Sequence, residues 1–230
     1  MEIKHLLAAV DHTLLKPTAT WEEIRQLCDE AAAFRCASVC IPPSYVKAAA
    51  EYLNGQVPVG TVVGFPNGYA TTMVKVFETR DAVVNGAGEI DLVINLGWVK
   101  DGRWQALLEE IRAVRKACGP QVLKVIVETC LLTQEEKVRL CQIVSDGGAD
   151  YIKTSTGFST GGATREDVAL MRQHVASHVK IKAAGGINSL EDGVELLELG
   201  AARLGSSRMV SLARAQGFSP EERGSISHQA

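Results

Sequence analysis

Short runs of apolar residues alternate along the chain with longer segments in which apolar residues recur every three or four positions. The short runs are rich in β-branched residues and end at glycine, proline or polar turns, which is typical of strands. The run at Val57–Phe65 is almost wholly apolar, as in a parallel strand that is buried on both faces. Eight strands are predicted: Val10–Leu15, Ala37–Ile41, Val57–Phe65, Ile90–Asn95, Val122–Glu128, Tyr151–Lys153, Val179–Ala184 and Ala202–Gly205.

The longer segments between these runs have the spacing of amphipathic helices. Three of them begin with a capping sequence, at Thr20, Thr133 and Ser189, in which a hydroxyl residue precedes an acidic residue by three positions. A further capped helix is predicted from Thr164 to about Val175, between the two lysine-bearing strands. The last helix is expected to begin at Ser206-Ser207 and to end near Ala215.

Regular alternation of strands and helices predicts a parallel sheet. Eight units within 230 residues match a (β/α)₈ TIM barrel, folded as a single domain over residues 1–218. A doubly wound open sheet is the alternative, but its G-x-G-x-x-G signature does not follow the first strand. Residues 219–230 are polar and contain no periodic apolar positions, so we expect a disordered tail.

The composition narrows the class of protein. The chain is 46% hydrophobic and 22% charged with a net charge of −3, which supports a large core and gives no support for nucleic-acid binding. No apolar run has the length of a membrane helix. The six cysteines form no C-x-x-C motif, and no Cys/His cluster has metal-ligand spacing, so we expect a reduced, cytoplasmic compartment and neither a metal nor another cofactor.

Two lysines interrupt apolar strands just before polar or glycine-rich turns. Lys153 precedes Thr154-Ser155-Thr156-Gly157, and Lys182 precedes Ala183-Ala184-Gly185-Gly186. If their strands are parallel neighbours, the two amines face each other and lower each other's affinity for protons. A neutral lysine amine is a nucleophile that forms Schiff bases with carbonyl compounds, although the spacing alone does not say which lysine attacks.

Other polar residues also lie inside the predicted strands. Each could form a structural salt bridge, but together they predict a polar barrel mouth suited to proton transfer around an amine. Asp91 and Glu128 are candidates for moving protons or for orienting Lys182. The remaining members of this set are Asp11, Asn95 and Lys124.

Glycine and serine follow the last two predicted strands. Gly185-Gly186 ends the seventh strand, and Gly205-Ser206-Ser207 ends the eighth and leads into a helix. Glycine lets backbone N–H groups approach an anion, and the loops after strands seven and eight bind phosphate in many barrels. The pattern therefore predicts a phosphate site, with ordinary tight turns as the alternative.

These segments resemble the deoxyribose-phosphate aldolase family. The resemblance extends from Asp11 to Phe218 and rests on six motifs in the family's order. They are Asp11-His12-Thr13-Leu14-Leu15, Val63-Gly64-Phe65-Pro66, Glu89-Ile90-Asp91, Lys153-Thr154-Ser155-Thr156-Gly157, Lys182-Ala183-Ala184-Gly185-Gly186 and Gly205-Ser206-Ser207.

The resemblance implies a metal-free class I aldolase that reversibly cleaves 2-deoxy-D-ribose 5-phosphate to D-glyceraldehyde 3-phosphate and acetaldehyde. Lys153 would form the Schiff base, with Lys182 lowering its pKa and relaying protons beside Asp91. The chain departs from those family members that end in a tyrosine, since its tail contains none. Gly157, Gly185, Gly186, Gly205, Ser206 and Ser207 would lie on the phosphate side.

Two rival functions remain open at this stage. A phosphosugar isomerase on the same barrel would use a carboxylate base such as Glu128 and would need no imine. A non-catalytic phosphometabolite-binding barrel would bind its ligand and form no covalent adduct. For all three functions we expect small-molecule phosphosugar or aldehyde ligands, and for the aldolase we expect a homo-oligomer, either a dimer or a tetramer.

Overall fold

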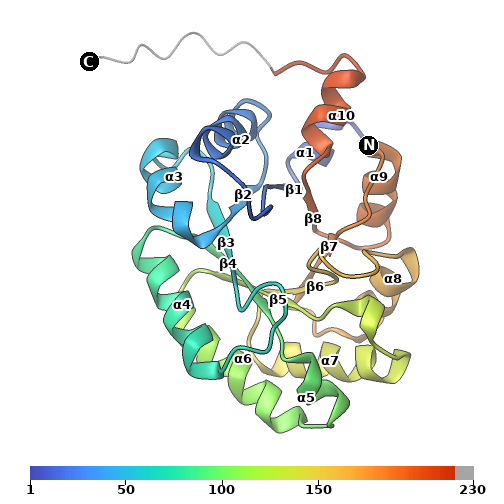
Figure 1. The fold of residues 1–230 in the computed structure, drawn as a ribbon. Helices are drawn as coiled ribbons and strands as arrows, with labels where there is room; N and C mark the ends of the chain where they lie inside the picture. Colours follow the sequence, from blue (N-terminus) through green and yellow to red (C-terminus); the bar gives the residue numbers. More distant parts are fainter. Residues whose placement is uncertain (221–230) are drawn as a thin grey trace.

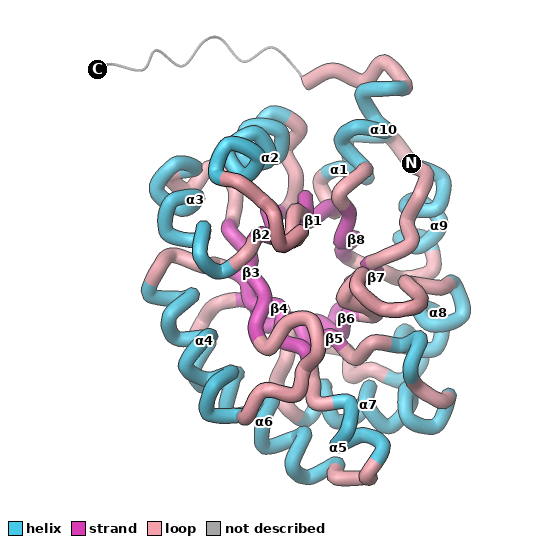
Figure 2. The backbone as a smooth tube through the Cα atoms, in the orientation of Figure 1, coloured by secondary structure: helices cyan, strands magenta, loops and turns pink. Residues whose placement is uncertain are grey.

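Eight parallel strands form a closed barrel in this computed structural model, which describes residues 1–220. Each strand pairs with the next in chain order, and β8 pairs with β1, so the sheet has no open edge (Figures 1 and 2). The predicted TIM barrel is therefore confirmed. The strands are β1 (Val10–Thr13), β2 (Ser38–Ile41), β3 (Val59–Val63), β4 (Glu89–Val93), β5 (Val122–Ile126), β6 (Tyr151–Lys153), β7 (Lys180–Ala184) and β8 (Arg203–Ser206).

The helices surround the barrel as an outer layer (Figure 2). Capping boxes at Thr20, Thr133 and Ser189 start three of them, and Thr164 caps a fourth, so these predicted starts are confirmed. Two short 3₁₀ helices, η1 (Pro43–Tyr45) and η2 (Thr129–Leu131), follow β2 and β5. The α-helices are α1 (Ile3–Leu7), α2 (Trp21–Ala33), α3 (Val46–Leu53), α4 (Thr72–Val84), α5 (Leu96–Lys100), α6 (Trp104–Cys118), α7 (Gln134–Asp146), α8 (Arg165–His174), α9 (Leu190–Glu198) and α10 (Met209–Ala215).

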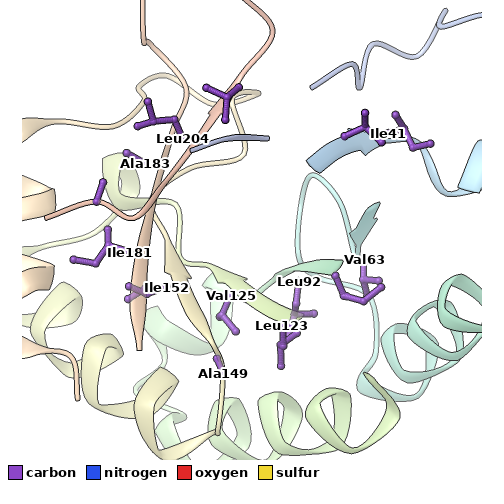
Figure 3. Close-up of a cluster of buried hydrophobic side chains, with 14 of the residues drawn as sticks. Ile41, Val63, Leu92, Leu123, Val125, Ala149, Ile152, Ile181, Ala183 and Leu204 are labelled. Atoms are coloured by element: carbon purple, nitrogen blue, oxygen red, sulfur yellow. The ribbon is translucent and has the colours of Figure 1, made fainter. Parts of the chain in front are cut away.

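The hydrophobic core lies between the strands and the helices. Successive side chains of a strand point to opposite faces, so every second residue faces the helical layer. Leu92 of β4, Val125 of β5 and Ile152 of β6 belong to this outer core and are completely buried (Figure 3). The alternate residues of the same strands face the barrel interior, and many of them are charged.

Four strands end earlier than predicted. β1 ends at Thr13 rather than at Leu15, and local backbone conformation explains the other three ends. β3 stops at Val63 because Gly64 takes a left-handed conformation, with φ of +63°. Asn95 lies outside β4, where its side chain caps the short helix α5. Glu128 lies beyond β5 in a left-handed conformation, with φ of +57°.

The eighth strand and the final helix are also displaced from their predicted bounds. Ser206 belongs to β8, and α10 begins at Met209 rather than at the two serines. Within residues 1–220, no helix has both the length and the apolar character that crossing a membrane requires. The division into a barrel over residues 1–218 and a disordered tail stays a prediction, because residues 221–230 of that tail lie outside the described part of the chain.

Candidate active site

A network of seven charged side chains fills the interior of the barrel. Its carboxylates and its cations come from six different strands and meet across the barrel rather than only between neighbours. Lys182 of β7, for example, contacts Asp91 of β4. The members of this charged network are Asp11, Glu89, Asp91, Lys124, Lys153, Lys182 and Arg203.

The predicted trio of Lys153, Lys182 and Asp91 is brought together in this network. Lys153 and Lys182 are direct partners in the register of β6 and β7. The Nζ atom of each lysine lies 2.7 Å from the same oxygen, Oδ2 of Asp91. The two amines therefore share a single hydrogen-bond acceptor.

The three lysines of the network differ in the number of carboxylates that they contact. Lys124 contacts Glu89 at 2.5 Å, Asp91 at 2.9 Å and Asp11 at 3.1 Å. Lys182 contacts Asp11 at 2.5 Å and Asp91 at 2.7 Å. Lys153 contacts Asp91 alone, so its positive charge is the least compensated of the three.

The pKa directions follow from this difference in partners. Burial lowers the pKa of Lys153 and the charge of Lys182 lowers it further, while Asp91 opposes the shift without reversing it. Burial acts on Lys182 and Lys124 in the same sense, but their carboxylate partners outweigh it. The pKa of Lys182 is therefore raised, and that of Lys124 is raised well above its ordinary value.

The count of charges in the network leads to the same conclusion. Three carboxylates, those of Asp11, Glu89 and Asp91, face three lysines and Arg203. Burial alone would raise the pKa of Asp91, but Lys124, Lys153 and Lys182 together hold it well below its ordinary value. With the carboxylates ionised, the network is electrically balanced only when one cation loses its proton, and Lys153 is the cation that gives it up most readily.

Two members of the network had no predicted role: Glu89, which appears only within the motif Glu89-Ile90-Asp91, and Arg203. Arg203 contacts Glu89 at 3.1 Å and also forms an ion pair with Asp11. Arg203 is the register partner of Lys182, which places its side chain on the interior face of β8. Glu89 precedes Asp91 by two residues, so the alternation of side chains along a strand could have shown that both face inward.

A cleft of about 490 Å³ opens at the carboxyl ends of the strands. Lys153 is the one member of the charged network that lines it; Lys124 and Lys182 lie deeper and are completely buried. All six predicted phosphate-side residues line the same cleft: Gly157, Gly185, Gly186, Gly205, Ser206 and Ser207. A larger groove of about 680 Å³ lies between α6 and α7, and no residue of the network lines it.

Two of these glycines occupy positions that a side chain could not share. Gly185 has φ of +79°, and a Cβ atom there would lie 3.2 Å from Gly162 Cα and 3.5 Å from Gly157 Cα. A Cβ atom on Gly205 would lie 2.9 Å from Ala184 Cβ and 3.1 Å from Lys182 Cε. Glycine at these two positions therefore keeps the cleft wall thin and leaves room for the lysine beneath it.

Two other candidates from the sequence, Glu128 and Asn95, do not contact the lysines. The Glu128 carboxylate is buried and accepts hydrogen bonds from the backbone N–H and the hydroxyl of Thr156, so it supports the loop after β6 rather than contacting Lys182. Asn95 caps α5. Cys40 of β2 is buried beside the charged network; burial and the charge of Asp91 raise the pKa of its thiol, although the nearby lysines act in the opposite sense.

The donor set of the site consists of amines and carboxylates in close contact. Across residues 1–220, no group of three or more His, Cys, Asp or Glu side chains is arranged to hold a metal ion. The interior carboxylates instead surround lysine and arginine nitrogens.

Comparison with known families accounts for this combination of fold and site. The family described as DeoC/LacD family aldolase matches residues 5–216. The chain belongs to the DeoC/LacD aldolase family. Because aldolases of this kind are lyases, the chain is an enzyme of the lyase class.

Individual relatives in the DeoC/LacD family match nearly the full chain. A deoxyribose-phosphate aldolase of Streptococcus agalactiae is 58% identical over 216 residues, which cover 94% of this chain and 97% of the relative. A deoxyribose-phosphate aldolase of Streptococcus pyogenes is 56% identical over 221 residues, which cover 96% and 99% of the two chains. The tetrameric deoxyribose phosphate aldolase structure from Aeropyrum pernix superposes with a TM-score of 0.86 at 31% identity, covering 94% of this chain and 92% of that one.

Proposed function

We propose that this DeoC/LacD family member is a class I aldolase that reversibly cleaves 2-deoxy-D-ribose 5-phosphate to D-glyceraldehyde 3-phosphate and acetaldehyde. The observation that carries the proposal is the position of Lys153. It lines the cleft, it has a lowered pKa, and it contacts only one carboxylate. A neutral amine at the mouth of a barrel is the group that forms an imine with a sugar aldehyde. The names of the relatives supply the substrate class.

In the cleavage direction, the neutral amine of Lys153 adds to C1 of the open-chain sugar. Loss of water then gives a protonated imine. A base removes the proton of the C3 hydroxyl, and the C2–C3 bond breaks as its electrons move toward the imine nitrogen. Glyceraldehyde 3-phosphate leaves, and a two-carbon enamine stays on Lys153. Protonation of the enamine at C2 and hydrolysis of the resulting imine release acetaldehyde and restore the amine.

The neighbours of Lys153 suit the proton transfers in this sequence. Lys182 has a raised pKa and is an ammonium ion when the enamine forms, so it can give a proton to C2 of the enamine. The proton that the C3 hydroxyl loses to water earlier in the cycle then returns to Lys182. Asp91 contacts both amines and can hold that water between them. We therefore assign Lys153 as the nucleophile, Lys182 as the proton donor and Asp91 as the group that links them.

The phosphate of the substrate would lie at the loops after β6, β7 and β8. Gly157, Gly185 and Gly186 present backbone without side chains to the cleft. Ser206 and Ser207 line it next to the glycine turn, because β8 pairs directly with β7. A phosphate at this edge would leave the sugar carbonyl, several atoms away, within reach of Lys153.

Reductive trapping tests the proposed mechanism. Acetaldehyde and borohydride should leave a reduced two-carbon adduct on Lys153, mapped by peptide mass spectrometry, and Lys153→Met should remove both adduct and turnover. An adduct on Lys182 in the unmutated enzyme would reverse the two roles. Turnover without any lysine adduct would instead favour an isomerase that uses a carboxylate base, and phosphosugar binding without turnover would favour a binding barrel.

We also propose that the enzyme forms a homo-oligomer through the outer face of α4. Nine large apolar side chains are exposed in residues 1–220, and five of them lie on α4 or the turn before it: Tyr69, Met73, Val74, Phe77 and Val84. The opposite face of α4 packs against the barrel and α6, where Lys75, Val76, Thr79 and Ala82 are buried. Large apolar side chains that gather on the outer face of such a helix are normally covered by a partner.

A second copy of the chain is the occupant that the charges of α4 favour. Arg80 and Asp81 are exposed beside Phe77, and neither forms an ion pair within residues 1–220. A twofold axis between Arg80 and Asp81 would pair α4 antiparallel with its copy, bring Arg80 close to Asp81 of the partner subunit and place Phe77 against Val84 of the partner subunit. The tetrameric relative from Aeropyrum pernix supports self-association. The cytoplasmic location expected from the cysteines stays a prediction.

A further inference from the structure

The outer part of the cleft is positively charged. Its lining contains three cationic side chains, Lys16, Lys153 and Arg208, and no carboxylate. Lys153 lies at the inner end, where the imine would form. The charge that an incoming anion meets first therefore comes from Lys16 and Arg208, which are both exposed.

These two outer cations differ in their partners. Lys16 forms an ion pair with Glu23 at 2.5 Å, so its charge is compensated locally. Arg208 donates from Nη1 to the side-chain oxygen of Asn188 at 3.1 Å, and this partner is neutral. Within residues 1–220, Arg208 has no carboxylate partner, and it therefore brings an uncompensated positive charge to the cleft.

Arg208 lies where the loops after β7 and β8 meet. It directly follows Ser207, and its backbone N–H donates to the Ser206 hydroxyl oxygen at 3.1 Å. Its partner Asn188 donates from Nδ2 to the Gly186 carbonyl oxygen at 3.0 Å. The guanidinium group is thus held beside both glycine and serine turns that form the proposed phosphate side.

We infer that Arg208 is a specificity-determining residue that binds the phosphate group of the substrate. The inference deepens the proposed function and rests on it. Guanidinium is a planar donor fork that binds phosphate oxygens in pairs, and it stays charged at any pH at which the enzyme works. Arg208 can keep its bond to Asn188 with one nitrogen and offer the others to the phosphate.

Substitution at Arg208 tests this inference through substrate preference. Arg208→Met keeps the length of the side chain and removes its charge. We expect the ratio of kcat/KM for 2-deoxyribose 5-phosphate over 2-deoxyribose to fall by roughly 10- to 100-fold, the loss expected for hydrogen bonds to a charged group. Arg208→Lys should restore part of the ratio. Arg139→Met, on the exposed surface of α7, is the charge-matched control and should leave the ratio unchanged.

Asn188→Ala separates charge from loop support. It removes the neutral partner and leaves the guanidinium in the cleft, so the ratio should fall less than in Arg208→Met. A ratio that is unchanged in Arg208→Met, or a fall in Asn188→Ala as large as that in Arg208→Met, would overturn the inference.

A binding measurement keeps this test independent of turnover. Inorganic phosphate titrated into the unmutated protein by calorimetry should bind with a dissociation constant that rises in Arg208→Met and weakens with added salt. If the unmutated protein cleaves no deoxyribose phosphate, the proposed function fails, while this titration still decides the role of Arg208. Equal phosphate affinity in the two proteins would place the anion elsewhere.

Discussion

Lys153 and Lys182 lie directly opposite each other in the ladder of β6 and β7, and both reach the same oxygen of Asp91 at 2.7 Å. One oxygen cannot compensate two full charges in a buried setting. Lys182 has Asp11 as a second carboxylate partner, and Lys153 has none. This difference in the number of carboxylate partners is the reason why we propose Lys153 as the nucleophile and Lys182 as the proton donor.

Removal of Lys182 should move the pH dependence of trapping upward. In Lys182→Met the like charge that lowers the pKa of Lys153 is gone, and Asp91 is left with one cation fewer. Both changes raise the pKa of Lys153, so less neutral amine is present at neutral pH. We expect very weak turnover, with the borohydride adduct on Lys153 recovered as the pH is raised. A trapping profile identical to that of the unmutated enzyme would show that Lys182 has no influence on this pKa.

Removal of the Asp91 charge should have the opposite effect on the amine. Asp91 raises the pKa of Lys153, so Asp91→Asn should lower that pKa and let trapping proceed at lower pH. Turnover should nevertheless fall by roughly 10²-fold or more, the usual loss for a group that takes part in proton transfer. The free energy of unfolding should drop by about 3–5 kcal/mol, because buried lysines lose a carboxylate. Normal kcat in a folded Asp91→Asn variant would leave Asp91 with a structural role only.

Replacement of Lys153 should stabilise the protein while it removes activity. The folded-state pKa of Lys153 lies below the unfolded value, so its protonated form is disfavoured in the folded chain. Lys153→Met removes the free-energy cost of holding a protonated amine at this buried position. The gain in unfolding free energy should be greatest below the folded-state pKa and should shrink as the pH rises toward the unfolded value of about 10.4. Urea denaturation at several pH values measures it, with the exposed Lys47→Met as control; a constant difference at all pH values would contradict the lowered pKa.

A negative charge at the proposed phosphate side should discriminate between substrates. Ser207 is exposed and lines the cleft, so Ser207→Glu places a carboxylate where the phosphate is expected. The KM for 2-deoxyribose 5-phosphate should rise far more than the KM for 2-deoxyribose. Steady-state kinetics with both sugars measure this, and equal increases would locate the phosphate at another part of the cleft.

A charge in the apolar face of α4 should prevent self-association. Phe77 is 71% exposed at the centre of that face. Phe77→Glu would place a carboxylate against the apolar Val84 of the partner subunit, and sedimentation velocity should then show monomers. Glu109→Gln on the exposed side of α6 is a control outside the surface. An unmutated enzyme that is already monomeric, or an unchanged oligomer in Phe77→Glu, would reject this surface.

The fold could be predicted from the sequence because its signals are local. An apolar run such as that around Ile90 indicates a strand, and a capping sequence such as Thr20 to Glu23 indicates the start of a helix. Each signal involves only a few neighbouring residues, and the order of the signals gives the alternation of strands and helices. The ends of the strands could not be predicted in the same way. Asn95 and Glu128 are polar residues next to apolar runs, and only the backbone conformation shows that they have left the strand.

The site was predictable in part for the same reason. Lys153, Lys182 and Asp91 stand out because each is a charge inside an apolar strand. The contact of Arg203 with Glu89 crosses the barrel between β8 and β4, and it depends on strand register and barrel closure. Arg203 is the first residue of β8. Charged residues are common at strand ends, so the sequence alone does not mark Arg203 as a member of the site.

The apolar residues of the strands face outward to the helices, while the charged network faces inward, and this division has a consequence for protein engineering. Side chains such as Val125 and Ile152 pack in the hydrophobic core and stabilise the fold from one face of their strands. The other face of the same strands carries Lys124 and Lys153. Substitutions in the cleft, made to accept longer aldehydes, would therefore change residues that contribute little to the packing of the hydrophobic core. The free energy of unfolding could be raised independently, by substitutions in the layer between strands and helices. Residues of that layer do not contact a substrate.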